Sequence, residues 1–216
     1  MYNNSQFEET RPEVLHALLR SHPLAMLVTL TAQGLEANHI PLYLRTQGVE
    51  RPTLVGHVAR ANRLWRDADL AMPVLAIFQG PQHYISPGWY ASKAEHGKVV
   101  PTWNYAVVHA KGTLQVRDDA AWIRAQMVEL TGQQEAGMVH PWRVDDAPPD
   151  YTDKLLGAVV GIEIPIDALF GKWKVSQNQP EANQVTVQQG LQGLGTEAGA
   201  AMAGLVDAFG VNAKKG

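Results

Sequence analysis

The chain lacks cysteine altogether, with none among its 216 residues. Disulfide bonds, thiolate catalysis and zinc sites with sulfur ligands are therefore excluded. No apolar run approaches the ~20 residues that a membrane-spanning helix needs. The first residues, Met1-Tyr2-Asn3-Asn4-Ser5, have neither the basic start nor the apolar core of a signal peptide. These absences predict a cytoplasmic protein without a membrane segment.

Positive charge is scarce as well. Lys and Arg number 18 against 21 Asp and Glu, so the formal net charge is -3. A protein that binds DNA independently of its sequence draws its affinity from Lys and Arg placed against phosphates. The chain also has no helix-turn-helix signature and no basic stripe. The composition therefore disfavours direct DNA binding, unless the fold gathers a local basic patch.

Familiar catalytic motifs are missing too. The sequence contains no G-x-S-x-G elbow, no H-E-x-x-H, no P-loop and no G-x-G-x-x-G after a strand. Its eight histidines do not have the tight spacing of metal ligands. The pairs Asp118-Asp119 and Asp145-Asp146 are more typical of helix caps than of acid and base partners. We therefore assign no metal site and no catalytic residue.

The chain does contain 45% hydrophobic residues, enough for one sizeable core. Short apolar runs between turn residues predict six or seven strands. The expected strand segments are 24–30, 35–44, 53–58, 73–78, 103–117 (a pair broken at Lys111-Gly112), 158–166 and 173–177. Pro41 predicts a sheet edge or a bend, because proline cannot donate to the strand ladder. The stretch 79–104 is expected to be rich in loops.

Three helices are expected outside the strands. Thr10-Arg11-Pro12-Glu13 is typical of a capping box, Asp118 is expected to cap a second helix, and a third lies around 150–156. No strand–helix–strand unit repeats, which favours a mainly β fold with peripheral helices, an antiparallel barrel. We expect one domain over residues 1–192. Residues 193–216 are expected to be a Gly- and Ala-rich extension, helical or partly disordered.

The segment Gly56–Asn62 is a candidate anion site. A strand is expected to end here and a helical turn to begin, which would offer unpaired N–H groups and a positive dipole. Arg60 adds a fork of donors that suits phosphate, and Asn62 adds an amide donor. The alternative is an ordinary strand-to-helix corner with a surface arginine.

Three further segments combine aromatic and polar groups. Residues 77–90 and 99–105 place aromatic side chains beside polar ones in irregular backbone, which suits a flat heterocycle. The alternative is that these rings only plug the mouth of the barrel. In the segment Gly171–Asn178, Lys172 and Lys174 should point the same way along a strand. Two such cations suit a phosphate or an anionic ring edge, or simply form a solvated strand face.

Taken together, these motifs resemble the PaiB family, in the same order and spacing from residue 1 to about 192. The resemblance rests on the segments Met1-Tyr2, Gly34–Leu42, Gly56–Asn62, Ile85–Tyr90, Val100–Tyr105 and Lys172–Asn178. It implies an FMN-binding split β-barrel related to the pyridoxamine phosphate oxidase superfamily. It also implies a homodimer with two flavin sites at the subunit interface. The family is described as negative transcriptional regulators of sporulation and degradative-enzyme genes.

The resemblance also implies cofactor contacts, which we place on the matching motifs. Arg60 and Asn62, with His57 nearby, are expected at the FMN phosphate. The stretch Thr102-Trp103-Asn104 is expected near the flavin ring, and Lys174 and Gln177 near the flavin of the partner. The full set of expected FMN-binding residues is His57, Arg60, Asn62, Tyr84, Ser86, Trp89, Thr102, Trp103, Asn104, Lys174 and Gln177.

The chain departs from the family pattern at one position, Gly88, where a serine is expected. Loss of that hydroxyl is expected to weaken one polar contact and loosen the loop. Three functions are compatible with the sequence. The first is an FMN-binding regulator of the PaiB type. The second is an FMN-dependent oxidoreductase with a nicotinamide or deazaflavin donor, since bound FMN can accept a hydride. The third is a haem-binding split barrel, in which a histidine would ligate the iron.

Overall fold

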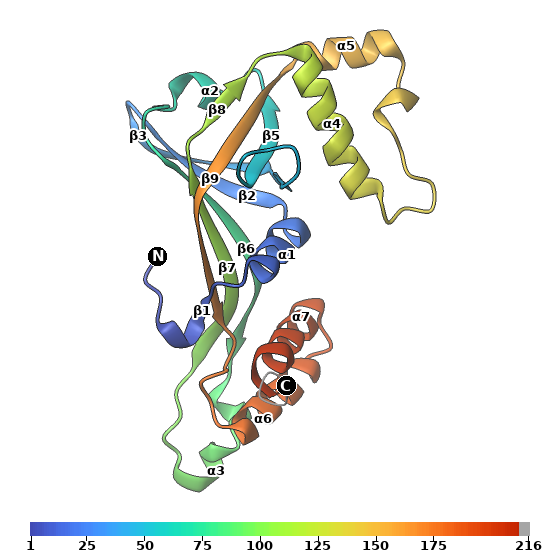
Figure 1. Ribbon diagram of the computed structural model, residues 1–216. Coiled ribbons are helices and arrows are strands. Elements are labelled where there is room, and N and C mark those ends of the chain that lie inside the picture. Colours follow the sequence, from blue (N-terminus) through green and yellow to red (C-terminus); the bar gives the residue numbers. More distant parts are fainter. Residues whose placement is uncertain (212–216) are drawn as a thin grey trace. The chain divides into compact units, whose positions relative to one another are not determined.

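The structure is a computed structural model that describes residues 1–211 of the chain (Figure 1). Nine strands and seven α-helices lie within these residues. The strands are β1 (Glu8–Glu9), β2 (Leu24–Thr31), β3 (Gly34–Pro41), β4 (Tyr43–Arg45), β5 (Thr53–Ala59), β6 (Val74–Ile85), β7 (Thr102–Gly112), β8 (Gln115–Arg117) and β9 (Val159–Lys174). The helices are α1 (Pro12–Ser21), α2 (Leu64–Asp67), α3 (Ser92–His96), α4 (Ala120–Glu135), α5 (Pro149–Gly157), α6 (Glu181–Gln192) and α7 (Glu197–Val206).

The strands form a nine-stranded sheet with the order β3-β2-β6-β7-β9-β5-β4, and β1 and β8 also pair with β9. The pairings of β2 with β3 and β6, of β4 with β5, and of β5, β8 and β1 with β9 are all antiparallel. Six strands have seven or more residues, and the other three have two or three. The predicted fold class, mainly β with an antiparallel sheet and peripheral helices, is confirmed.

The chain divides into two compact units, each made of separate stretches of sequence. Unit 1 comprises residues 1–18, 79–108 and the residues from 170 onward. Unit 2 comprises residues 19–78 and 109–169. The strands β6, β7 and β9 contribute residues to both. The predicted domain boundary at residue 192 stays a prediction.

Unit 2 has an apolar core formed by its strands, and α4 packs on the other face of β5 and β9, at His57 and Gly161. Leu27, Leu54 and Ile162 on β2, β5 and β9 are completely buried. The indole of Trp122 on α4 packs so closely on β9 that a Cβ atom at Gly161 would lie 2.2 Å from it. Glycine at position 161 therefore allows the helix to approach the strand.

The N-cap of α4 differs from the predicted one. Asp119, not Asp118, accepts a hydrogen bond from the N–H of Trp122, at 2.7 Å, and so caps the helix. The carboxylate of Asp118 instead pairs with Arg60. The sequence offers two adjacent aspartates, and only the backbone conformation, extended at Asp119, decides which of them caps.

Unit 1 contains the helices α3, α6 and α7, of which α6 and α7 pack against each other (Figure 1). Residues 197–206 of the predicted extension form α7, and a π-helical turn follows over Asp207–Val211. The last five residues of the extension lie outside the described residues. Thr196 caps α7, because its hydroxyl accepts from the N–H of Gly199 at 3.1 Å.

Two strands extend further than their apolar runs predict. β6 continues through Gly80 and Pro81 to Ile85, and β9 is unbroken from Val159 to Lys174. By contrast, Pro41 ends β3, and β3 lies at the edge of the sheet, as expected. Within residues 1–211 no helix combines the length and apolar character needed to cross a membrane.

Candidate functional site

Unit 1 holds a cavity of about 360 Å³ where the start of β7 meets the end of β9. This volume lies in the range of small-molecule pockets. Three of the expected cofactor residues, Thr102, Asn104 and Lys174, line it. The structure therefore brings together groups from two motifs that are some 70 positions apart in the sequence, because β7 and β9 are neighbouring strands of the sheet.

Lys174 is the charged group in the wall of this cavity that comes from β9. Its ammonium donates to the hydroxyl of Thr102 and, at 2.9 Å, to the carbonyl of Trp103. Partial burial lowers the pKa of Lys174, and the neighbouring charge of Lys172 lowers it further. Both effects disfavour the ammonium form, so an anion beside Lys174 would be stabilising.

Lys172 does not share this role, although it lies two residues away on the same strand. Its side chain is buried, and its ammonium donates to the carbonyl of Tyr2 at 3.0 Å. The same ammonium lies 5.4 Å and 5.6 Å from the ring centres of Tyr2 and Tyr105. The expectation of two equivalent cations is therefore wrong. Lys174 faces the cavity, whereas Lys172 binds the N-terminal residues.

Asn104 and Ser176 form a buried polar pair in the cavity wall. The Asn104 amide nitrogen donates to the Ser176 hydroxyl at 2.8 Å, and both residues are almost fully buried. Ser176 has a φ of 67°, in the left-handed region that a non-glycine residue adopts at a cost. Gln177 next to it is occupied, since it accepts from the N–H of Val175 at 2.8 Å and donates to the carbonyl of Gln6 at 3.1 Å.

Tyr84 and Trp103 present exposed rings in unit 1. The two rings meet edge to face, with 6.1 Å between their centres. Trp103 is half exposed, and its indole nitrogen donates to the Gln82 side chain at 3.0 Å. These rings offer free aromatic surface for a flat ligand.

Ser86 and Trp89 have local structural contacts. The Ser86 hydroxyl accepts from the N–H of Gly88 at 3.1 Å and caps a short 3-10 turn. The ring of Trp89 is covered by α6, because a Cβ atom at Gly190 would lie 2.5 Å from it. Part of the Trp89 ring is therefore covered by α6 and is not available to a ligand.

Arg60 belongs to unit 2, where its guanidinium is already engaged. It forms a two-pronged pair with Asp118, at 2.6 Å and 3.0 Å, and the hydrogen bond to Arg60 holds the pKa of Asp118 below its usual range. It also donates to the carbonyls of Gly157 at 2.7 Å and Val159 at 3.0 Å. A phosphate at Arg60 would have to compete with Asp118.

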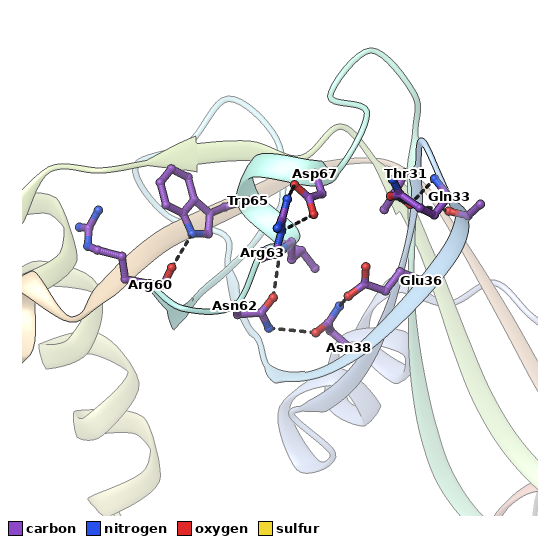
Figure 2. Close-up of polar contacts among 11 residues, drawn as sticks. Thr31, Gln33, Glu36, Asn38, Arg60, Asn62, Arg63, Trp65 and Asp67 are labelled. Atoms are coloured by element: carbon purple, nitrogen blue, oxygen red, sulfur yellow. Dashed lines mark hydrogen bonds and ion pairs between the residues drawn. The ribbon is translucent and has the colours of Figure 1, made fainter.

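Asn62 and His57 are the other expected phosphate contacts, and both have partners within unit 2. Asn62 donates to Asn38 at 2.9 Å and accepts from the N–H of Leu64, the first residue of the four-residue helix α2, at 2.9 Å. Figure 2 shows the Asn62 side chain turned toward Asn38 and away from the guanidinium of Arg60. His57 Nδ1 lies 2.8 Å from the side-chain oxygen of the fully buried Gln126.

The expected residues thus fall into two groups, His57, Arg60 and Asn62 in unit 2 and the remainder in unit 1. The cavity also contains residues that sequence reasoning missed. Ser92, Ser176 and Asn183 line it. Ser176 lies inside the Lys172–Asn178 motif, so the motif itself could have indicated it. Ser92 and Asn183 carry no signal in a single sequence, because folding alone brings them to the cavity.

A family model described as "Putative FMN-binding domain" matches residues 1–168. The chain belongs to this family. Among curated proteins, the uncharacterized protein AN0679 of Emericella nidulans is 32% identical over 95% of this chain and 96% of its own length. The protease synthase and sporulation protein PAI 2 of Bacillus subtilis is 31% identical over 89% of each chain. These matches confirm the predicted PaiB-type FMN-binding family.

Solved structures support the fold. The FAD and heme binding protein from Mycobacterium smegmatis has a TM-score of 0.55 and 22% identity, covering 77% of this chain and 73% of its own. At this identity the likeness speaks for the fold, the split barrel of flavin-binding proteins.

Unit 1 contains the kinds of group that a flavin needs, although Tyr84 and Trp103 lie outside the lining of the cavity. A flavin ring has two flat faces and an edge rich in hydrogen-bond acceptors. Tyr84 and Trp103 supply aromatic surface, and Lys174 supplies a cation that both its burial and Lys172 make receptive to an anion.

Proposed function

We propose that the protein binds FMN at the interface of a homodimer, with the ring beside the start of β7 of one copy and the phosphate at the segment Gly56–Asn62 of its partner. The observation that carries the proposal is the placement of Lys174, a partly buried ammonium held against Thr102 and Trp103 in a ligand-sized cavity. Preorganised cations in a site of low dielectric stabilise negative charge well. Bound FMN would supply redox chemistry, and Lys174 would stabilise negative charge at the edge of the ring.

For the phosphate, Arg60 is the group of unit 2 best suited by charge. Its guanidinium can exchange a carboxylate partner for a phosphate with the same two-pronged geometry. Asp118 would then hold the Arg60 guanidinium in position until FMN binds. This role depends on how readily Asp118 is displaced, because the two anions compete for the same nitrogens.

We further propose a homodimer that forms through the outer face of β2, β3 and β6 in unit 2. Leu24 and Leu35 on this face are 60% and 79% exposed, and Met26 lies between them on β2. In the sheet, Leu30 is opposite Leu35 and Met26 is opposite Ile77. Exposed apolar side chains gathered on one face of a sheet mark an interaction surface. A second copy of the chain would cover it with an identical apolar face.

The biological role proposed for the FMN protein is regulation of the PaiB type. The supporting relative, PAI 2, is named as a protease synthase and sporulation protein. Direct contact with DNA is disfavoured by the net charge of -3. We infer that such regulation would act through a partner whose binding depends on FMN. Saturable, salt-sensitive binding of promoter DNA would contradict the indirect route.

An FMN-dependent oxidoreductase is the second candidate, and Lys174 favours it because a cation at the ring edge stabilises the extra charge of a reduced flavin. Rapid anaerobic mixing distinguishes the two functions. Reduction of bound FMN within seconds by NADH, NADPH or a reduced deazaflavin supports the enzyme. A flavin that stays oxidised with all three donors supports the regulator.

The test of the central proposal is a titration of the purified protein with FMN, with riboflavin as the phosphate-free control. Flavin fluorescence and absorbance report binding. We expect micromolar or tighter binding of FMN and much weaker binding of riboflavin. A folded protein that binds haemin but not FMN would replace this proposal with the haem alternative.

A further inference from the structure

The cavity of unit 1 has an unusual charge. Three of its lining residues, His96, Lys98 and Lys174, are basic, and none of its lining residues is Asp or Glu. The whole chain, by contrast, has an excess of acidic residues. A concave surface lined by charges of one sign focuses the field and attracts counter-ions.

Elsewhere in the protein, seven arginines are paired with carboxylates. Each ion pair found among residues 1–211 joins an arginine to a carboxylate, and none of them includes His96, Lys98 or Lys174. The Lys174 ammonium has only the hydroxyl of Thr102 and the carbonyl of Trp103 as partners among these residues, so it carries an uncompensated charge. A bound anion would supply the missing negative charge.

His96 is set up to donate a hydrogen bond. Its Nδ1 accepts from the backbone N–H of Lys98 at 3.0 Å. In the neutral ring the proton must therefore be on Nε2, so that nitrogen is a donor.

Asn183 of α6 connects two parts of the cavity wall. Its side-chain oxygen accepts from the N–H of Ser92 at 3.0 Å, and its amide nitrogen donates to the Ser92 hydroxyl at 3.0 Å and to the Gln179 side chain at 3.2 Å. Asn183 is almost fully buried. It therefore joins the start of α3 to the loop after β9, and it fixes two sides of the cavity together.

We propose that this cavity is a binding site for a small anionic ligand that carries a phosphate monoester or a carboxylate. Lys174, Lys98 and His96 recognise the anion, and Asn183 maintains the shape of the site. The site does not depend on the proposed phosphate site at Arg60. The anion has two sources, the phosphate of FMN itself or a separate anionic substrate or effector.

The test uses the full chain without added flavin and two probes, inorganic phosphate and pyrophosphate, titrated at low ionic strength by calorimetry. We expect saturable binding that weakens by roughly 10-fold or more in the double variant His96→Gln/Lys98→Ala, because charge-assisted hydrogen bonds are lost. Lys93→Ala is the matched control, since Lys93 lies in α3 but does not line the cavity. Absence of saturable binding, or an equal loss in the control, would overturn the proposal.

Repeating the phosphate titration with saturating FMN and with saturating riboflavin identifies the source. Competition by FMN but not by riboflavin assigns the site to the phosphate of FMN, and binding of phosphate in addition to FMN assigns it to a separate ligand. Both results support an anion site. Competition by both flavins would show that the ring itself fills the cavity and would overturn the anion site. Failure of FMN to bind at all would refute the proposed cofactor but leave the phosphate titration interpretable.

Discussion

Asp118 grips Arg60 by both terminal nitrogens, with Oδ1 2.6 Å from Nη2 and Oδ2 3.0 Å from Nη1. This carboxylate accepts hydrogen bonds from the same nitrogens that are proposed to bind the FMN phosphate. The two ligands therefore exclude each other, and the affinity of FMN depends on both residues.

The Arg60→Ala variant tests this directly. Loss of a charge-assisted contact should weaken FMN binding roughly 10- to 150-fold, while Asp118→Asn should strengthen it by removing the competitor. Flavin fluorescence titration measures both. Arg63→Ala is the matched control, because Arg63 pairs with Asp67 within α2 in a similar way. An Arg60→Ala protein with unchanged FMN affinity would show that the phosphate binds elsewhere, and the cavity of unit 1 would be the next candidate.

The second prediction concerns the pH dependence of anion binding at Lys174. Burial, together with Lys172, lowers the pKa of Lys174, so its positive charge is lost at a lower pH than in an ordinary lysine. The other titratable groups at the cavity are His96, Lys98 and Tyr90. Phosphate affinity should therefore fall as pH rises through a range below the ordinary lysine pKa of about 10.4.

Lys174→Arg is the matched variant for this measurement. An arginine stays charged throughout the range, so its phosphate affinity should stay flat where that of the natural protein declines. Calorimetric titrations at a series of pH values compare the two proteins. Parallel pH profiles would mean that Lys174 is not the group responsible.

The third prediction concerns the apolar face of unit 2. Leu35→Glu would place a charge within the proposed dimer contact, where an unpaired buried charge is costly. We expect the variant to sediment as a monomer at concentrations where the natural chain is a dimer. Val139→Glu is the control, since Val139 is 89% exposed and lies in the connection between α4 and α5. If Leu35→Glu remains dimeric, the second copy docks on another surface.

Local rules predicted much of the fold, because they depend on neighbouring residues. Proline at position 41 ended β3, and short apolar runs located β2 and β5. The same rules could not choose between Asp118 and Asp119 as a cap, since the choice depends on a backbone angle. They also treated Lys172 and Lys174 as equivalent. The two lysines differ only through tertiary partners, the carbonyl of Tyr2 for one and the hydroxyl of Thr102 for the other.

The candidate site was predictable to a similar degree. Motifs located Thr102, Asn104 and Lys174, because each lies within a recognisable run of residues. Asn183 could not be found in this way. Its importance comes from Ser92, which is far from it in sequence, and a single sequence holds no record of which distant segments will meet.

The last prediction separates strain from hydrogen bonding at Ser176. Its φ of 67° is costly for serine but not for glycine, while its hydroxyl accepts the 2.8 Å hydrogen bond from Asn104. Ser176→Ala keeps the backbone strain and leaves the buried Asn104 amide unpaired, so it should lower the free energy of unfolding by about 1–3 kcal/mol. Ser176→Gly loses the same hydrogen bond but relieves the strain, so its free energy of unfolding should be about 1 kcal/mol higher than that of Ser176→Ala.

Urea unfolding followed by tryptophan fluorescence measures both variants, and Asn104→Ala completes the comparison. If the hydrogen bond carries the effect, the double variant Asn104→Ala/Ser176→Ala should lose less stability than the two single losses added together, because each single change leaves a buried polar group unpaired and the double change leaves none. Strictly additive losses would show that the two side chains contribute independently. In that case the left-handed backbone at Ser176 is held by its neighbours along the chain rather than by Asn104.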